Sequence, residues 1–321
     1  DSLLEIKMGI IRGGDSEYEE HEPSFEEKSA EWQKVLQPLL EEDPCLLKLS
    51  GKYISNDDVK IICDYQAIEK VRVLDLADNQ ISDEALPILF ESDKLGKLEE
   101  LYLGINFLMG QGLTDISCSK KIKLKNLRTL VVSDNRLADI SVADFIRSEN
   151  FPNLECLDVG WNEVGNETAK ALGEKTFFSG LRNLNLDRSY IDIEGLKEMV
   201  RGDLMDQLQE LNLSANKLKD DAVKVLASAQ KWKALKVLRL SQNMFGDEGA
   251  KALGESVSLA GLSHLYAGRN YFGNQGAQAI HESKTLTSLQ TLVLKEGVEE
   301  DTGLVNYSRP ELLRPDDPNS I

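Results

Sequence analysis

The feature that most constrains this chain is a short apolar pattern that recurs at a nearly constant spacing. The stretch from Leu208 to Leu218 has leucine at its first, fourth and sixth places, asparagine at its ninth and leucine at its eleventh. The pattern begins again after 27 residues along most of the sequence, with one longer spacing of 29. A weaker copy opens at Pro44, and the first apolar residues of the others are Val71, Leu98, Leu127, Leu154, Leu181, Leu208, Leu235, Leu262 and Leu289. A fixed period of this length predicts a solenoid of ten stacked coils.

Each copy predicts a short strand followed by a turn. We number the residues of each repeat from its first apolar residue, so that the leucines at positions 4 and 6 point inward and their neighbours outward. Leu211 and Leu213 are therefore expected to be fully buried. An inward amide at position 9 can pair with backbone groups that the turn leaves unpaired. Ser189 takes this place in one repeat, and asparagine takes it in seven: Asn79, Asn106, Asn135, Asn162, Asn216, Asn243 and Asn270.

The second half of each repeat predicts a helix. In the run from Asp247 to Gly254, helical spacing places Gly249 and Leu253 on one face with the preceding Phe245. Phe245 and its counterpart Phe272 are expected in the core. Small residues at the first helical contact should let each helix lie close to its strand; they are Ala85, Thr168, Gly195, Ala222, Gly249 and Gly276.

A repeat of 27 residues with a full helix resembles the ribonuclease-inhibitor-type leucine-rich repeats. The runs from Asn243 to Leu253 and from Asn270 to Ile280 are close to the consensus of that subfamily. The resemblance implies an α/β fold, a horseshoe-shaped solenoid with a parallel concave sheet and outer helices. It says little about function, because such scaffolds host many binding tasks.

The regions outside the repeats predict caps. Ser24 to Glu27 forms a capping box, and the helix that follows is expected to cover the first coil with Trp32, Val35 and Leu36. Pro38 should end or kink that helix, with Leu39 and Leu40 continuing the cover. We therefore expect three regions: an acidic leader and capping helix over residues 1–43, a solenoid over 44–297, and a C-terminal cap or tail over 298–321.

Composition narrows the classes of partner. The net charge of −18 argues against a nucleic-acid backbone or an anionic membrane as the main partner. The chain lacks an apolar run of about 18 residues, so no membrane span is expected. It begins at Asp1 rather than Met, and we expect a processed chain or part of a longer one. Cysteines form no cluster at the ends, which favours a reducing, cytoplasmic setting with small buried thiols: Cys45, Cys63, Cys118 and Cys156.

The sequence offers little for catalysis. Of the three histidines, His21 lies in the leader, and His264 and His281 lie in one repeat. No nucleophile and base can be paired, no spacing is typical of metal ligands, and no glycine-rich phosphate loop follows a strand. We predict no enzymatic activity, no cofactor and no bound metal.

Aromatic residues concentrate on the outward positions. Positions 3, 5, 7, 8 and 10 lie on the concave face or the loop beside it, and Phe107 is one of the residues found there. Strand propensity explains Tyr102 and Tyr266 but not Trp161, which follows its strand. Large aromatic side chains often dominate protein interfaces. The chain has eleven tyrosine and tryptophan residues in all, and six of them occupy these positions: Tyr53, Tyr102, Trp161, Tyr190, Tyr266 and Tyr271.

Charge on the same positions is uneven. Arg239 and Arg269 make the late repeats mildly basic. In the four repeats from Val71, six carboxylates face one arginine, Arg136; they are Asp75, Asp78, Glu100, Asp134, Asp158 and Glu163. Such polarity would orient a docked protein. The lysines within residues 109–126 are interpreted as a solvated outer loop rather than a docking site.

Together these patterns predict a scaffold, monomeric when unbound, that binds a folded protein on its concave face and inhibits or regulates it. One alternative is an activator resembling the GTPase-activating protein of the Ran system, with Arg136 as its arginine; another is a sensor module of a larger receptor. The chain is also similar to leucine-rich-repeat effectors of intracellular bacterial pathogens, which implies the host cytosol. The predicted contact residues are Asp75, Tyr102, Phe107, Asp158, Trp161, Tyr190, Arg239, Tyr266 and Tyr271.

Overall fold

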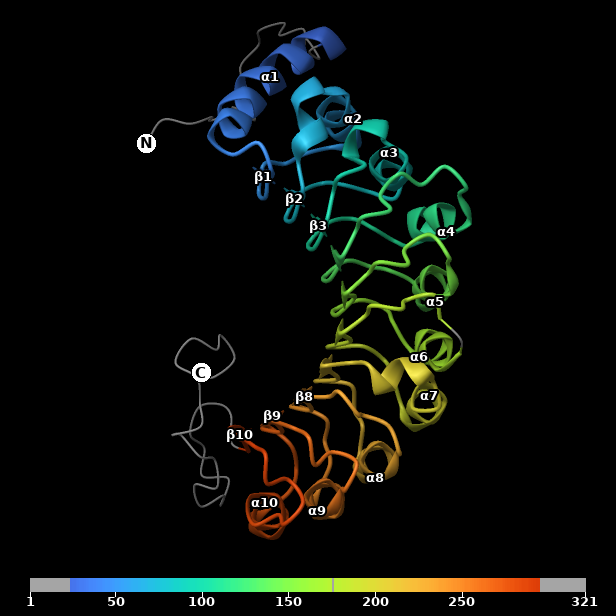
Figure 1. Cartoon of the computed structure of the whole chain (residues 1–321), viewed down its shortest axis with the longest axis vertical. Helices are drawn as coiled ribbons and strands as arrows, with labels where there is room; N and C mark the ends of the chain where they lie inside the picture. The colour runs from blue at the N-terminus through green and yellow to red at the C-terminus, as the bar shows by residue number, and fades with distance from the viewer. Residues whose placement is uncertain (1–23, 175, 295–321) are drawn as a thin grey trace, which may run out of the picture.

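The computed structural model describes residues 24–174 and 176–294 as one curved stack of coils. Each coil contributes a strand to the inner face and a helix to the outer face, and the chain climbs by one coil per repeat (Figure 1). This is the horseshoe-shaped α/β solenoid that the period predicts. The expected leader, the end of the solenoid at residue 297 and the C-terminal cap lie outside the described residues.

The ten strands form a single parallel sheet in sequence order, β1 to β10. Equivalent residues of successive repeats pair with one another, so that Leu47 is opposite Leu74, and Leu74 opposite Leu101. The register therefore follows the 27-residue period. The strands are β1 Leu46–Lys48, β2 Val73–Asp75, β3 Glu100–Tyr102, β4 Thr129–Val131, β5 Cys156–Asp158, β6 Asn183–Asn185, β7 Glu210–Asn212, β8 Val237–Arg239, β9 His264–Tyr266 and β10 Thr291–Val293.

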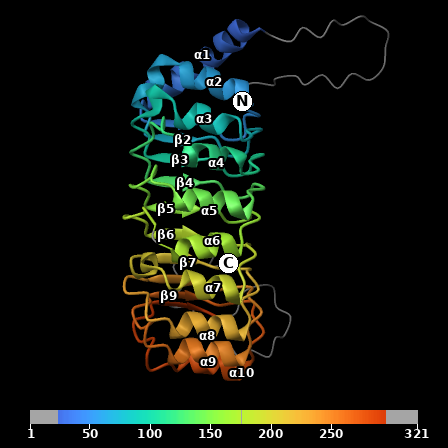
Figure 2. The same cartoon turned by 90° about the vertical axis from the view of Figure 1, so that its right-hand side faces the viewer.

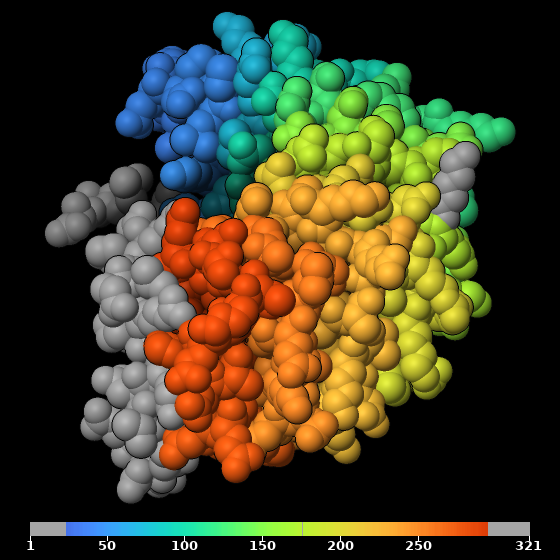
Figure 3. All heavy atoms as spheres, turned by 60° about the horizontal axis from the view of Figure 1, so that its bottom comes forward, coloured from blue at the N-terminus to red at the C-terminus, as the bar shows by residue number. Residues whose placement is uncertain are grey.

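The helices stack along the convex face, each beside the helix of the next repeat (Figure 2). Their bounds are α1 Phe25–Glu42, α2 Asn56–Asp64, α3 Ala85–Phe90, α4 Gln111–Cys118, α5 Asp139–Arg147, α6 Asn166–Gly173, α7 Ile193–Met199, α8 Asp220–Ser228, α9 Asp247–Glu255 and α10 Asn274–His281. Short 3-10 helices occupy Gln66–Lys70, Asp93–Leu95 and Asp203–Asp206. In the space-filling view the C-terminal coils, orange and red, face the reader, and the earlier coils lie behind them (Figure 3).

The core is continuous from the capping helix to the last described coil. Leu211 and Leu213 are completely buried, as predicted. Phe245 and Phe272 are buried as well, and their rings stack with centroids 5.4 Å apart. Because every coil repeats this arrangement, apolar burial stabilises each repeat mainly through its neighbours.

The asparagines at position 9 form the predicted polar ladder. Nδ2 of Asn243 donates to three backbone carbonyl oxygens, one of them in the preceding repeat. Its Oδ1 accepts hydrogen bonds from the backbone N–H groups of Asn216 and Leu218, at 2.9 and 3.2 Å. One amide thus joins two coils. The Oγ of Ser189, which replaces asparagine in the repeat from Leu181, is buried and has no hydrogen-bond partner in the described part of the chain.

The first described helix, α1, covers the open end of the first coil. The capping box at Ser24 and Glu27 is formed, and Leu36 is buried against the core. The indole N–H of Trp32 donates to Asp58 Oδ1 at 2.8 Å, which ties α1 to α2. The expectation that Pro38 could end the helix is wrong, because α1 continues past it to Glu42. Packing against the core holds the last turn although proline cannot supply a backbone N–H.

Small residues at the start of the helices have a more specific cause than close helix–strand packing. A Cβ added to Gly249 would lie 2.8 Å from Asp220 Oδ1, and one added to Gly276 would lie 2.6 Å from Asp247 Oδ1. In both cases the carboxylate belongs to the preceding repeat and accepts hydrogen bonds from this helix end. Glycine is therefore needed where a cap from the neighbouring coil approaches the backbone.

The cysteines only partly follow the prediction. All four are free thiols, as expected, but only Cys63 is buried, and burial followed by the charge of Asp64 raises its pKa to about 12. Cys45 and Cys118 are exposed and Cys156 is partly exposed, so the prediction of small buried thiols is wrong for these three. Cys45 precedes β1, Cys118 ends α4, and Cys156 is the first residue of β5, so all three lie outside the inward apolar positions of the repeat.

Candidate protein-binding surface

The segment that joins each strand to the following helix, positions 7 to 12 of a repeat, runs along one side of the horseshoe. We call these segments together the loop edge. Their backbone is unusual, because position 8 is left-handed in nine successive repeats, with φ between 48° and 65°. Residues other than glycine rarely adopt this backbone conformation. The residues that hold it are Gly51, Asp78, Ile105, Asp134, Trp161, Arg188, Ala215, Gln242 and Arg269.

Hydrogen bonds between coils fix the loop edge. The N–H of Ile105, at position 8, donates to the carbonyl oxygen of Ser133 in the next repeat at 3.0 Å. The N–H of Phe107, at position 10, donates to the carbonyl oxygen of Ile81 in the preceding repeat at 2.8 Å. The same pairings recur along the stack, as for Tyr190 and Tyr271. Positions 8 and 10 therefore form two rows of side chains held at regular intervals by rigid backbone.

The loop edge carries most of the exposed apolar surface. Of eleven large apolar side chains that are exposed in the described part of the chain, seven lie on it. Their exposed fractions run from 47% to 74%, so they are open to a partner and not part of the core. The seven are Tyr53, Ile105, Phe107, Met109, Trp161, Tyr190 and Tyr271.

Trp161 lies near the middle of this row and is held by polar contacts to the next coil. Its indole N–H donates to Asp187 Oδ2 at 2.9 Å. The guanidinium of Arg188 lies over its ring, 3.8 Å from the centroid, in cation–π geometry. Tyr190 follows on the same coil as Arg188 and is exposed. The result is an ordered aromatic and charged cluster, which loses little freedom when a partner covers it.

Carboxylates in this cluster and on the adjoining strand β5 are partly desolvated. Burial raises the pKa of Asp158, against the lowering effect of a 3.0 Å hydrogen bond from the N–H of Gly160. Burial likewise raises the pKa of Asp187, against the hydrogen bond from Trp161. Burial, and then the charge of Asp158, raises the pKa of Cys156 to about 11, so its thiol stays protonated near neutral pH.

The strand tyrosines differ from the loop aromatics. The hydroxyl of Tyr102 donates to Glu100 Oε2 at 2.7 Å, and this bond raises the pKa of Tyr102 to about 12. Tyr266 is only 2% exposed, and the guanidinium of Arg239 lies 4.2 Å from its ring centroid. Arg239 also forms an ion pair with Glu210 at 3.2 Å. Tyr266, which the sequence nominated as a contact residue, is therefore buried in this structure, unlike the exposed aromatic residues of the loop edge.

The remaining nominated residues lie where the period places them. Asp75 is partly exposed on β2 and accepts a hydrogen bond from the N–H of Ala77 at 3.0 Å. Phe107 is exposed on the loop edge, and Arg136 is exposed beside it on the next coil. Within the nominated set, Arg239 contacts Tyr266, and Asp75 is opposite Tyr102 in the sheet register.

Sequence reasoning missed four residues of this surface: Ile105, Met109, Asp187 and Arg188. Asp187 and Arg188 occupy positions 7 and 8 of the repeat from Leu181, so extending the count of charges to that repeat would have found them. Ile105 was passed over because only aromatic residues were counted. Met109 stands at position 12, beyond the positions considered, and nothing in the sequence marks it as exposed.

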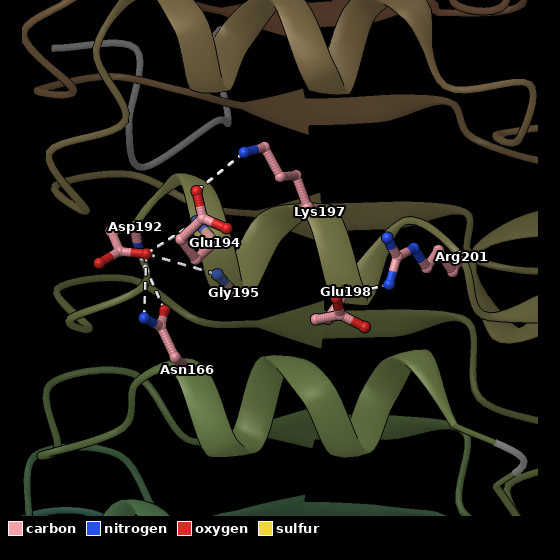
Figure 4. Close-up of polar contacts among 7 residues, drawn as sticks. All are labelled: Asn166, Asp192, Glu194, Gly195, Lys197, Glu198 and Arg201. Atoms are coloured by element: carbon pink, nitrogen blue, oxygen red, sulfur yellow. Dashed lines mark hydrogen bonds and ion pairs between the residues drawn. The ribbon is translucent and has the colours of Figure 1, made fainter.

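Where the loop edge meets the helices, polar caps join adjacent coils. Asp192 Oδ1 accepts hydrogen bonds from the N–H groups of Glu194 and Gly195 at the start of α7, and from the side-chain amide of Asn166 in the preceding repeat (Figure 4). Burial acts to raise the pKa of Asp192, but these bonds outweigh it and the pKa is lowered. Farther along α7, Lys197 pairs with Glu194 on the outer face. The caps hold the end of each loop at a fixed place.

The described residues show no group of three or more histidine, cysteine, aspartate or glutamate side chains arranged to hold a metal ion. In the same residues, no helix is both long and apolar enough to cross a membrane. The surface is built for contact by side chains that are aromatic, apolar and charged.

Comparison with known proteins was made by sequence and by structure. A family profile described as "Leucine Rich repeat" matches residues 68–86, 152–173, 208–227 and 234–254. Comparison with curated protein sequences gave no significant match.

Two solved structures are similar to this chain: the plant peptide hormone receptor RGFR1 in complex with RGF2, and the Arabidopsis receptor kinase HAESA in complex with the peptide hormone IDA and the co-receptor SERK1. Each is 18% identical over 78% of this chain, with TM-scores of 0.43 and 0.45. The chain spans 40% and 42% of the lengths of those chains. The ten-stranded sheet with its 27-residue register and the four profile matches show the fold of a leucine-rich-repeat solenoid.

Proposed function

We propose that the protein is an interaction scaffold that binds a folded protein partner across its loop edge and the adjoining concave sheet. The observation that carries this proposal is the row of exposed aromatic and apolar side chains on the loop edge. Exposed apolar side chains grouped on a rigid surface are typical of docking sites, whereas scattered ones need no explanation.

The size of the surface supports a protein rather than a small ligand. Neighbouring strands lie about 4.8 Å apart, so ten of them give an inner face on the order of 45 Å long. A standard interface buries roughly 800 Å² on each partner, which fits such a face. The acidic early repeats and the Arg188 and Arg239 side chains farther along would orient the partner as it docks. A partner covered in this way would be regulated by the scaffold.

The centre of the interface is proposed to be Trp161 with Arg188 and Tyr190. A central, ordered aromatic side chain often contributes more to binding than its rim. We expect Trp161→Ala to weaken partner binding by about 2 kcal/mol or more. Its indole also donates to Asp187, so Trp161→Phe should retain the ring and lose only part of the affinity.

The test begins with a pull-down from the native cell and identification of the partner by mass spectrometry, followed by surface plasmon resonance with purified proteins. The matched control is Phe25→Ala, which removes an equally exposed aromatic residue, 47%, from the capping helix α1. Partner binding that is unchanged in Trp161→Ala, Tyr190→Ala and Tyr271→Ala would exclude the loop edge as the site. Loss of binding on mutation of Lys121 and Lys125 instead would place it on the outer loop.

We also propose a reducing, cytosolic setting. The four free thiols support it, because two exposed cysteines would be open to oxidation in a secreted protein. Fractionation of the source cell with an antibody to the chain tests this, and recovery of the protein outside the cytosol would contradict it.

A further inference from the structure

The repeat from Leu98 carries an apolar patch on the loop edge. Ile105, Phe107 and Met109 are alternate residues at positions 8, 10 and 12 of this repeat. The carbonyl oxygen of Met109 accepts a hydrogen bond from the N–H of Ala138 at 3.1 Å, which brings in Ile140 at the start of α5. All four side chains are between 53% and 63% exposed. We call Ile105, Phe107, Met109 and Ile140 the apolar patch.

Ile105 is poorly suited to its place in the fold. It is a β-branched residue with φ of 56°, a conformation that β-branched side chains rarely adopt. Eight of the nine repeats carry a residue other than glycine at this position, and Ile105 is the one β-branched residue among them. The isoleucine side chain is half exposed, so burial within the chain returns little stability for this strain. Its exposed side chain is therefore open to contact with a partner.

The patch has an acidic rim. In the row of position 8, Ile105 stands between Asp78 and Asp134 on the neighbouring coils, and both are exposed. Asp75 and Glu100 continue the acidic surface onto the concave sheet. In these three repeats the only cation at positions 7 to 12 is Arg136, which lies beside Phe107. The field over the patch is therefore set mainly by carboxylates.

We propose that the apolar patch binds a protein segment in which a large apolar side chain is flanked on both sides by lysine or arginine. The apolar side chain would cover Ile105 and Phe107, and the cations would face Asp78 and Asp134. With coils about 4.8 Å apart, the two carboxylates are on the order of 10 Å from each other, which about three extended residues span. The inference rests on the proposed function and names the chemistry of the partner.

Charge and burial argue against two other occupants of this surface. A second copy of the chain has a net charge of −18, and the apolar residues of its lysine-bearing loop, Ile122 and Leu124, are buried and cannot cover the patch. An anionic membrane would be repelled by the acidic rim. Basic groups on the partner are the complement that the rim requires.

The experiment uses fluorescence polarisation with three short labelled peptides of equal length. Each has a central phenylalanine, flanked by lysines in the first, serines in the second and glutamates in the third. We expect the lysine peptide to bind about tenfold or more tightly than the serine peptide, and added salt to reduce that difference. The glutamate peptide should bind most weakly. Equal binding of the three peptides, or binding of none, overturns the proposal.

Variants assign the binding to the patch. Ile105→Asn introduces a residue that tolerates the left-handed backbone conformation better than isoleucine does, so we expect a higher Tm. Because it also removes the apolar side chain, we expect the affinity for the lysine peptide to fall about tenfold. Asp78→Lys with Asp134→Lys should remove the preference for lysine over serine, and Arg136→Ala should strengthen it. Phe25→Ala, which removes an exposed aromatic residue from α1 outside the loop edge, is the control and should leave peptide binding unchanged.

The outcomes separate this inference from the proposed function. If Ile105→Asn lowers Tm and leaves peptide affinity intact, Ile105 serves the fold and the patch is not a binding site. If the protein binds its partner through Trp161 but does not discriminate among the peptides, this inference fails alone. If Trp161→Ala, Tyr190→Ala and Tyr271→Ala all leave partner binding unchanged, the proposed function fails, whatever the peptides show.

Discussion

The inward side of the coils and the loop edge are built on the same repeated backbone, yet they differ in how uniform their residues are. Position 9, which points inward, is asparagine in seven repeats, and positions 4 and 6 are almost all leucine. Position 8, only one residue earlier than the asparagine, is glycine, aspartate, isoleucine, tryptophan, arginine, alanine or glutamine. Inward residues must fit identical neighbours above and below, whereas most outward residues have one side open to solvent. Uniformity therefore marks the positions that the fold constrains, and variety marks those that it leaves free to differ.

The largest loss of stability is expected for a substitution at an inward position. Leu213 is completely buried, so Leu213→Asp would place an unpaired charge in an apolar stack and cost more than about 5 kcal/mol of stability. The control is Ala215→Asp in the same repeat, where φ of 56° and the aspartates of other repeats show that the residue is tolerated. Circular dichroism melts measure both variants. Leu213→Asp melting like the parent would mean that the inward and outward positions have been assigned wrongly.

The next largest loss of stability is expected for the asparagine ladder at position 9. Asn243→Ala removes an amide that pairs with five backbone groups, and we expect a loss of about 3 kcal/mol because several buried groups are left unpaired. Asn153, an exposed asparagine that donates only to the Lys125 carbonyl oxygen, provides the control Asn153→Ala. Urea denaturation compares the two. Similar losses in both would show that the ladder contributes no more than surface hydrogen bonds.

Ser189 interrupts the asparagine ladder, so a substitution that restores asparagine there should increase stability. Ser189→Asn would restore an amide where a buried hydroxyl now has no partner in the described residues. We expect a gain of about 1 kcal/mol, the net value of an added hydrogen bond. A thermal melt that shifts downward instead would mean that this coil has adapted to the smaller side chain.

The smallest expected effect is on the pH dependence of stability, and it involves Asp158 on the concave surface. Burial raises the folded-state pKa of Asp158, so the folded chain binds this proton more tightly than the unfolded chain does. Stability associated with this group therefore falls as pH rises through its folded pKa. Asp158→Asn should be more stable relative to the parent at about pH 7 than at about pH 4. Urea titrations at both values measure this, and a constant difference would contradict the desolvation of Asp158.

Much of the fold follows from the sequence alone. The 27-residue spacing requires equivalent residues to stack, so it determines the parallel register, the buried leucines and the place of the asparagine ladder. The capping box at Ser24 is equally local, since its two partners are three residues apart. These features depend on periodicity or on neighbours in sequence, which can be read directly. The loop positions of Trp161 and Tyr190 follow for the same reason.

Only the tertiary structure decided which outward side chains are exposed to solvent and which neighbouring residues they contact. Tyr102 and Tyr266 share position 5, but the first is partly exposed, whereas the second is buried and has the guanidinium of Arg239 over its ring. The contacts of Trp161 with Asp187 and Arg188 join residues 26 and 27 places apart, and depend on side-chain direction across two coils. A period states which residues stand side by side. It does not state how their side chains turn, because that depends on the size and charge of neighbours that differ from coil to coil.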